Sequence, residues 1–99
     1  MKMTTIEKTE IEIKKIIYKF LKPEEYKLFV FGSRATNNAR KFSDYDIGIS
    51  GSKPISFKKT ALIKEALEES DLPFRVDIVD FSMVSSEFKK EALSRIIKL

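Results

Sequence analysis

The sequence predicts one small α+β domain in which helices flank a sheet of short strands. Two kinds of segment indicate this class: apolar residues at helical spacing, and short runs rich in β-branched and aromatic residues, with Pro or Gly at several of the joins. Ninety-nine residues suit a single domain spanning residues 1–99. A hydrophobic content of 42% is enough to form a core rather than a disordered chain.

The first helix is expected to begin near Thr5 and to end before Pro23. Thr4 and Glu7 have the spacing of a capping box, in which each side chain satisfies a backbone N–H of the other residue. Apolar residues then recur at helical spacing, with Lys and Glu between them. This helix should cover one face of the sheet.

Three segments are expected to be strands. Residues 28–31 form an unbroken apolar run, which is typical of a central strand buried on both faces. Residues 43–50 alternate, so one face carries Tyr45, Ile47 and Ile49 and the other carries Asp44, Asp46 and Gly48. Residues 75–80 form the third strand.

Two further helices are expected, besides a brief one in the polar segment that ends at Lys41. The first spans residues 56–70, and the second spans residues 86–99. Their apolar sides are expected to comprise Phe57, Leu62, Ile63, Ala66 and Leu67 in the first, and Phe88, Ala92, Leu93, Ile96 and Ile97 in the second.

Composition excludes several kinds of chemistry. The chain has no Cys and no His, which rules out a thiolate zinc site, a Ser-His-Asp triad and a His general base. A net charge of +4 favours anionic partners such as a nucleoside triphosphate (NTP) or RNA. The chain start has no apolar signal region and no stretch approaches membrane-spanning length, so we expect a cytoplasmic protein with no membrane partner.

The candidate catalytic and metal-binding residues are three aspartates. Asp44 and Asp46 lie two apart on a predicted strand, so both can reach the same hard cation. A D-x-D pair alone is usually a solvated surface pair, but this one follows a Gly-Ser turn by ten residues. Asp77 on a neighbouring strand would complete a two-metal site. Asp80 points to the opposite face, at a strand end where Asp often caps a turn, so Asp77 is preferred.

The candidate nucleotide-binding residues are Gly32, Ser33 and Arg34, directly after the first strand. Gly32 has no Cβ and lets an anion approach the backbone. The N–H and hydroxyl of Ser33 can both donate to phosphate oxygens. Arg34 is a candidate phosphate or partner contact, with a solvated arginine as a nearly equal alternative. For Arg40 and Lys41 the solvated alternative is preferred.

These residues together resemble the nucleotidyltransferase superfamily that includes DNA polymerase beta, and most of all the minimal nucleotidyltransferases, the MNT or MntA-type antitoxins. Gly32-Ser33 and Asp44-Tyr45-Asp46 match the family pattern G-S-x10-D-x-D without an insertion. The motifs cover roughly residues 25–82. The family often reads G-S-R-A-R-G, whereas Thr36 and Asn37 follow Ala35 here, which removes one positive charge.

The resemblance implies a palm-type mixed sheet of three or four strands, and transfer of a nucleoside monophosphate, AMP by preference, from an NTP such as ATP. Two Mg²⁺ ions would be held by Asp44, Asp46 and Asp77. The implied acceptor is a tyrosine of a HEPN toxin that this chain would neutralise as its antitoxin. The chain is expected to form a hetero-oligomer or a homodimer.

Two other functions stay open. The chain could be a catalytically silent module that neutralises a HEPN partner by forming a complex. It could instead modify RNA or a small molecule, although no stripe of exposed aromatic and basic residues for gripping a strand is apparent.

Overall fold

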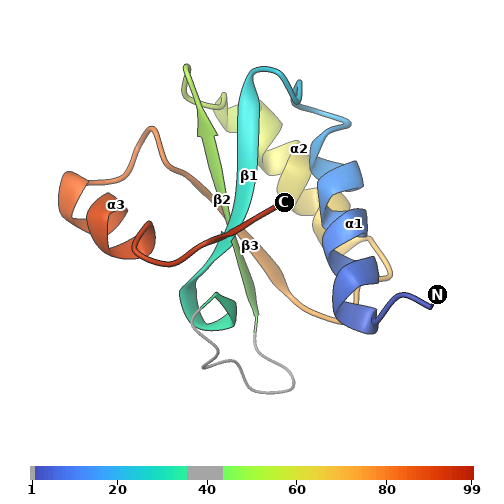
Figure 1. Ribbon diagram of the computed structural model, residues 1–99. Coiled ribbons are helices and arrows are strands. Elements are labelled where there is room, and N and C mark those ends of the chain that lie inside the picture. Colours follow the sequence, from blue (N-terminus) through green and yellow to red (C-terminus); the bar gives the residue numbers. More distant parts are fainter. Residues whose placement is uncertain (1, 36–43) are drawn as a thin grey trace.

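The computed structural model describes residues 2–35 and 44–99, which form three layers (Figure 1). Helices α1 and α2 lie on one side of a sheet, and helix α3 lies on the other side. The elements along the chain are α1 (Thr5–Ile17), β1 (Tyr26–Phe31), the 3₁₀ turn η1 (Gly32–Arg34), β2 (Tyr45–Gly51), α2 (Phe57–Glu68), β3 (Val76–Asp80), α3 (Ser86–Ala92) and β4 (Ile97–Lys98).

The sheet is mixed and its strand order is β3-β2-β1-β4. Strand β1 runs antiparallel to both of its neighbours, β2 and β4, whereas β3 runs parallel to β2. The parallel pair is connected through α2, as a parallel connection requires. This arrangement confirms the predicted α+β class, with four strands in the described part of the chain.

Helices α1, α2 and α3 are each preceded by a hydroxyl side chain that accepts a hydrogen bond from a backbone N–H of the first turn. Thr4 and Glu7 form the predicted capping box, with the Glu7 N–H donating to Thr4 Oγ1 at 3.1 Å. Ser56 and Ser85 cap α2 and α3 in the same way. No helix within residues 2–35 and 44–99 combines the length and apolarity needed to cross a lipid bilayer.

The larger core lies between the sheet and the layer of α1 and α2. Strand β1 is buried on both faces from Leu28 to Phe31, as predicted, and the alternating apolar face of β2 points into this core. Its largest fully buried side chains are Tyr45, Ile13, Ile17, Ile47, Ile49, Ile63 and Val30. Burial of these side chains is the main stabilising term of the fold.

A smaller aromatic core lies beneath α3, on the opposite face of the sheet. The Phe81 ring packs edge-on against Phe29 and Phe31, with ring centroids 4.8 and 5.2 Å apart. Gly48 of β2 lies directly beneath two of these rings, because a Cβ built there would overlap Phe29 and lie 2.8 Å from Phe81. The aromatic rings can therefore pack here because Gly48 has no side chain.

The prediction of one helix over residues 86–99 is wrong. Helix α3 ends at Ala92, and Ile97–Lys98 instead pair with β1 as strand β4. The Leu99 N–H also donates to the Leu28 carbonyl at 3.1 Å. Without β4, one edge of β1 would have backbone N–H and C=O groups with no partner strand. Ile96 and Ile97 are β-branched, so they suit a strand at least as well as a helix.

Some apolar residues expected to face inward are exposed. Phe57 at the start of α2 is 91% exposed, and Leu62 is 41% exposed. Phe88 is 43% exposed, although its ring still contacts Phe31 and Phe81. Helix α1 also ends earlier than expected, at Ile17, well before Pro23. Strands β1 and β3 and helix α2 match their predictions to within two residues, and so does the end of β2. Of the brief helix expected in the segment that ends at Lys41, the described residues contain only the 3₁₀ turn η1, and residue 43 of the second predicted strand lies outside them.

We predict that Gly48→Ala lowers the free energy of unfolding by about 1–3 kcal/mol, because the added methyl group overlaps the Phe29 ring. Urea denaturation followed by circular dichroism measures the change. Ser50→Ala is the matched control, since Ser50 is exposed on the same strand and should change stability by less than about 0.5 kcal/mol. Unchanged stability in Gly48→Ala would contradict the packing described above.

Candidate functional site

The register of the sheet brings Asp46 and Asp77 side by side. Asp46 of β2 pairs with Phe31 of β1 on one side and with Asp77 of β3 on the other. Paired residues on strands about 4.8 Å apart share a face, so both carboxylates project on the side of Phe31. Asp44 is exposed and lies directly before β2, two residues from Asp46. The structure therefore brings the three predicted carboxylates into one neighbourhood.

The carboxyl of Asp46 is half-buried in this neighbourhood, and its pKa is shifted. Burial raises the pKa of Asp46, and the negative charges of Asp77 and Asp44 raise it further. The ionised form of Asp46 is thus disfavoured by both its surroundings and its neighbours. A divalent cation placed among these groups would relieve the repulsion.

The carboxylates of Asp44, Asp46 and Asp77 are suitable ligands for a hard cation, although their present side-chain positions do not form a metal site. Among residues 2–35 and 44–99, no group of three Asp, Glu, His or Cys side chains is close enough to bind a metal ion in its present rotamers. Asp77 instead faces Arg75, with 3.8 Å between Oδ1 and Nε. Both side chains are more than half exposed, and such a pair contributes less than about 1 kcal/mol. Rotation of Asp77 toward Asp46 therefore costs little, and carboxylate oxygens are the ligands that Mg²⁺ prefers.

Gly32 packs its backbone against the carboxylate of Asp46. Its φ of +76° lies in the left-handed region, and a Cβ built there would lie 2.5 Å from Asp46 Oδ2. Ser33 follows in the same 3₁₀ turn, which the Ala35 N–H closes by donating to the Gly32 carbonyl at 3.1 Å. The predicted phosphate-binding turn and the predicted metal ligands are therefore in direct contact.

Arg34 extends to the other face of the sheet. Its guanidinium carbon lies 4.2 Å from the centroid of the Tyr45 ring and 4.3 Å from that of Phe74. Tyr45 belongs to the face of β2 that packs beneath α1 and α2, opposite Asp46. The prediction that Arg34 binds nucleotide stays a prediction.

Asp80 has a structural role, as its position at the end of β3 suggested. Its Oδ2 accepts from the Ile55 N–H at 2.8 Å, and its Oδ1 accepts from the N–H and hydroxyl of Ser82 at 2.9 and 2.7 Å. The register pairs Asp80 with Ile49, on the face opposite Asp77. Both carboxylate oxygens are engaged in holding two loops together, which favours Asp77 as the third site carboxylate.

Sequence reasoning missed the aromatic residues around Arg34. The alternation of residues 43–50 predicts Tyr45 only as an apolar face residue, and the sequence pattern predicts no role for Phe74. Their signal was their proximity in sequence to the site, since Tyr45 lies between two of the carboxylates and Phe74 lies three residues before the third. Arg40, Lys41, Thr36 and Asn37 lie outside the described residues.

Comparison with known proteins points in the same direction as the geometry. Residues 11–99 match the family described as polymerase beta, nucleotidyltransferase. A probable protein adenylyltransferase MntA of Haemophilus influenzae is 40% identical over 85 residues, which covers 86% of this chain and 74% of the relative.

Two solved structures share the fold. A putative minimal nucleotidyltransferase superimposes with a TM-score of 0.70 at 26% identity, covering 98% of this chain and 97% of that one. A chain of the complex of tri-AMPylated Shewanella oneidensis HEPN toxin with MNT antitoxin superimposes with a TM-score of 0.70 at 20% identity, covering 93% and 69%. This second likeness is evidence for the fold alone.

We predict that Asp46→Asn raises the melting temperature of the cation-free protein by roughly 2–6 °C, because it removes a carboxylate whose charge is disfavoured by burial and by Asp77 and Asp44. Differential scanning calorimetry with and without Mg²⁺ measures this. Mg²⁺ should stabilise the wild-type protein and have a smaller effect on the variant.

The matched control is Asp71→Asn, since Asp71 is exposed in the loop after α2. It should leave both the melting temperature and the response to Mg²⁺ unchanged. A lower melting temperature for Asp46→Asn would mean that its carboxylate makes stabilising contacts instead.

Proposed function

The chain belongs to the polymerase beta nucleotidyltransferase family, and from that membership we propose that it transfers AMP from ATP to a hydroxyl of a protein partner. The observation that carries this proposal is the contact between the Gly32 turn and Asp46, with Asp77 paired beside it. A phosphate-binding turn next to acidic residues is what a nucleotidyl transfer requires.

The turn is proposed to hold the β- and γ-phosphates of ATP. The positive φ of Gly32 and its missing Cβ let the backbone approach both Asp46 and an anion. Ser33 would donate from its N–H and hydroxyl. The position of this turn would place the α-phosphate toward the carboxylates.

Asp44, Asp46 and Asp77 are proposed to hold two Mg²⁺ ions. When bound, the ions would neutralise phosphate charge and stabilise the attacking and leaving oxygens. The raised pKa of Asp46 supports this assignment, because burial raises it first and the nearby negative charges of Asp77 and Asp44 raise it further. The chain's own part in catalysis would be mostly positioning and charge stabilisation.

The proposed reaction is one in-line displacement. The acceptor oxygen forms a bond to the α-phosphorus, and the bond from that phosphorus to the oxygen bridging the α- and β-phosphates breaks. Pyrophosphate leaves with that oxygen. The hydroxyl proton passes toward Asp77, whose exposed carboxylate lies beside Asp46, and then to solvent.

The proposed acceptor is a tyrosine of a HEPN toxin, which this chain would neutralise as its antitoxin. The similarity that supports this is to the Haemophilus relative, which is named a probable protein adenylyltransferase. The Shewanella complex, one chain of which shares this fold, contains an AMPylated HEPN toxin beside an MNT antitoxin and so gives the proposal its form. A phenol on a protein surface can approach Asp77 because this carboxylate is exposed.

Neutralisation by complex formation alone is the second candidate. Phe57 and Met83 are 91% and 71% exposed, and large apolar side chains in solvent suit a protein partner. In that case the carboxylates would not be needed for neutralisation.

We predict that the protein, incubated with Mg²⁺ and ATP labelled on the α-phosphate, labels the HEPN-domain product of a neighbouring gene. Asp46→Asn should reduce the labelling rate at least about 100-fold, because it removes a central metal ligand. Asp71→Asn should label at the wild-type rate. Label from the γ-phosphate should stay off the protein, which separates AMP transfer from phosphorylation.

Mass spectrometry of the labelled partner would identify the modified residue, and its Tyr→Phe variant should take up no label. Wild-type labelling by Asp46→Asn would exclude the metal assignment. Absence of label together with a stable complex would favour neutralisation by complex formation, and labelled RNA would favour an RNA acceptor.

A further inference from the structure

We propose that Arg34 is a positioning residue that holds the Gly32–Ser33 turn against Asp46 through its stack with Tyr45 and Phe74, and not a ligand of the nucleotide. The effect of Arg34 on the turn can be measured whether or not the protein transfers a nucleotide. Its effect on catalysis rests on the function proposed above.

The stack is a cation placed against two aromatic rings. The guanidinium carbon of Arg34 lies 4.2 and 4.3 Å from the centroids of Tyr45 and Phe74, within the range in which a cation is attracted by a ring face. The two rings also contact each other edge-on, with centroids 5.4 Å apart. A planar guanidinium suits such a position better than an ammonium group.

The stack joins the three segments that carry the site. Arg34 belongs to η1, Tyr45 begins β2 between Asp44 and Asp46, and Phe74 lies in the loop that leads into β3. The Tyr45 N–H donates to the Arg75 carbonyl at 2.8 Å, which fixes the two ring-bearing segments to each other. A movement of Arg34 relative to these rings would therefore move the turn relative to the carboxylates.

The charge of Arg34 also acts on Glu10 of helix α1. Burial raises the pKa of Glu10, and the positive charge of Arg34 opposes that rise. The same charge opposes the rise that burial causes in the pKa of the Tyr45 hydroxyl. Arg34 is thus on the side of the sheet that α1 and α2 cover, as its stack on Tyr45 shows, whereas Asp46 and Asp77 project from the opposite face.

The turn is held from both faces of the sheet. On the carboxylate face, Gly32 leaves no room for a side chain between its backbone and Asp46 Oδ2. On the other face, Arg34 packs against Tyr45 directly beside Asp46 in sequence. Displacement of a substrate-binding group by about 1 Å can cost a reaction about 100-fold, so this restraint bears on the rate.

Tyr45 offers a control for the role of its ring. Its hydroxyl is buried and has no hydrogen-bond partner among the described residues. The ring, and not the hydroxyl, is therefore what contacts Arg34. Tyr45→Phe keeps the stack and removes only the hydroxyl.

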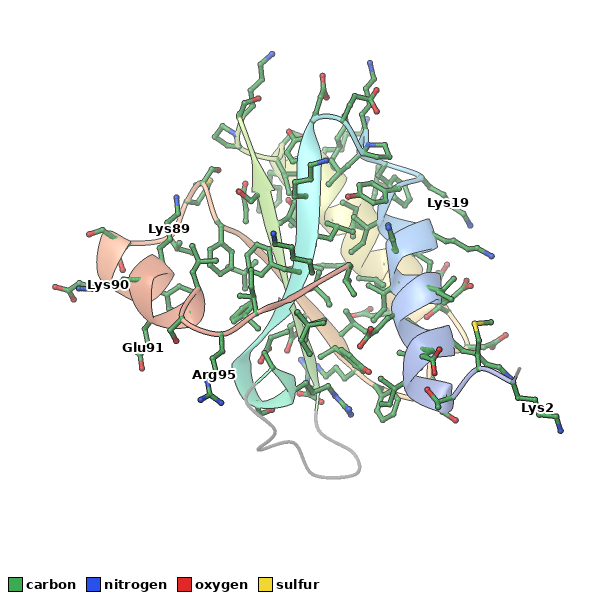
Figure 2. All side chains as sticks on the ribbon, in the orientation of Figure 1. Lys2, Lys19, Lys89, Lys90, Glu91 and Arg95 are labelled. Atoms are coloured by element: carbon green, nitrogen blue, oxygen red, sulfur yellow. The ribbon has the colours of Figure 1, made fainter. Side chains whose placement is uncertain are left out.

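Amide hydrogen exchange of the nucleotide-free protein, measured by NMR, tests the restraint. The reporter is the Ala35 amide, which donates to the Gly32 carbonyl and closes the turn. Arg34→Met and Phe74→Leu should each accelerate its exchange about tenfold, the size expected for losing a partly buried cation–π contact. Tyr45→Phe should leave it unchanged, as should Arg95→Met, which removes an exposed arginine after α3 (Figure 2).

Unchanged Ala35 exchange in both Arg34→Met and Phe74→Leu would overturn the proposal. Phe74→Leu keeps Arg34 itself, so it decides the question even where Arg34→Met fails to fold. Arg34→Lys is a further variant: acceleration there would support the need for a planar guanidinium.

The transfer assay tests the catalytic consequence. We expect Arg34→Met and Phe74→Leu each to lower kcat about 10- to 100-fold, and the double variant to be no slower than the slower single variant. Wild-type kcat in Phe74→Leu, with a raised KM for ATP in Arg34→Met alone, would show direct binding of phosphate and overturn the proposal. Where the wild-type protein transfers nothing, the proposed function fails while the exchange experiment still decides the role of Arg34.

Discussion

Strand β2 imposes the constraint on which the rest of the structure depends, because its two faces have opposite requirements. Tyr45, Ile47 and Ile49 must be buried beneath α1 and α2, which fixes the register with β1 and β3. A shift by one residue would expose this apolar face and bury Asp46 among the helices. The same hydrophobic contacts that stabilise the fold therefore set Asp46 beside Asp77 and Gly32, and the site needs no separate scaffold.

Local sequence information was sufficient for the features that depend on neighbouring residues. The capping box of α1, the alternation of β2 and the Gly-Ser turn each follow from side chains a few residues apart. The grouping of Asp46 with Asp77 also followed, because two predicted strands had a face in common. The turn role of Asp80 is predicted from its place at a strand end, and the two hydrogen bonds that it accepts from Ser82 confirm it.

Features that depend on distant partners were not predictable in the same way. Residues 96–99 carry a pattern compatible with a helix, and only the unpaired edge of β1 makes part of them a strand. Phe57 has helical spacing with buried residues, yet it is the first residue of α2 and is exposed. The surroundings of Arg34 depend on Phe74, which reaches it only through the path of the chain between α2 and β3. The residues between α2 and β3 contain no local sequence signal that would predict where Phe74 lies.

The space above Gly48 has an evolutionary consequence. The rings of Phe29 and Phe81 occupy the volume that a side chain at residue 48 would fill, so these three positions share one fixed volume. Related chains can divide that volume differently, but only by compensating changes. A larger residue in place of Gly48 should be accompanied by a smaller one in place of Phe29 or Phe81, and these positions should vary together while the neighbouring carboxylates do not take part in the exchange.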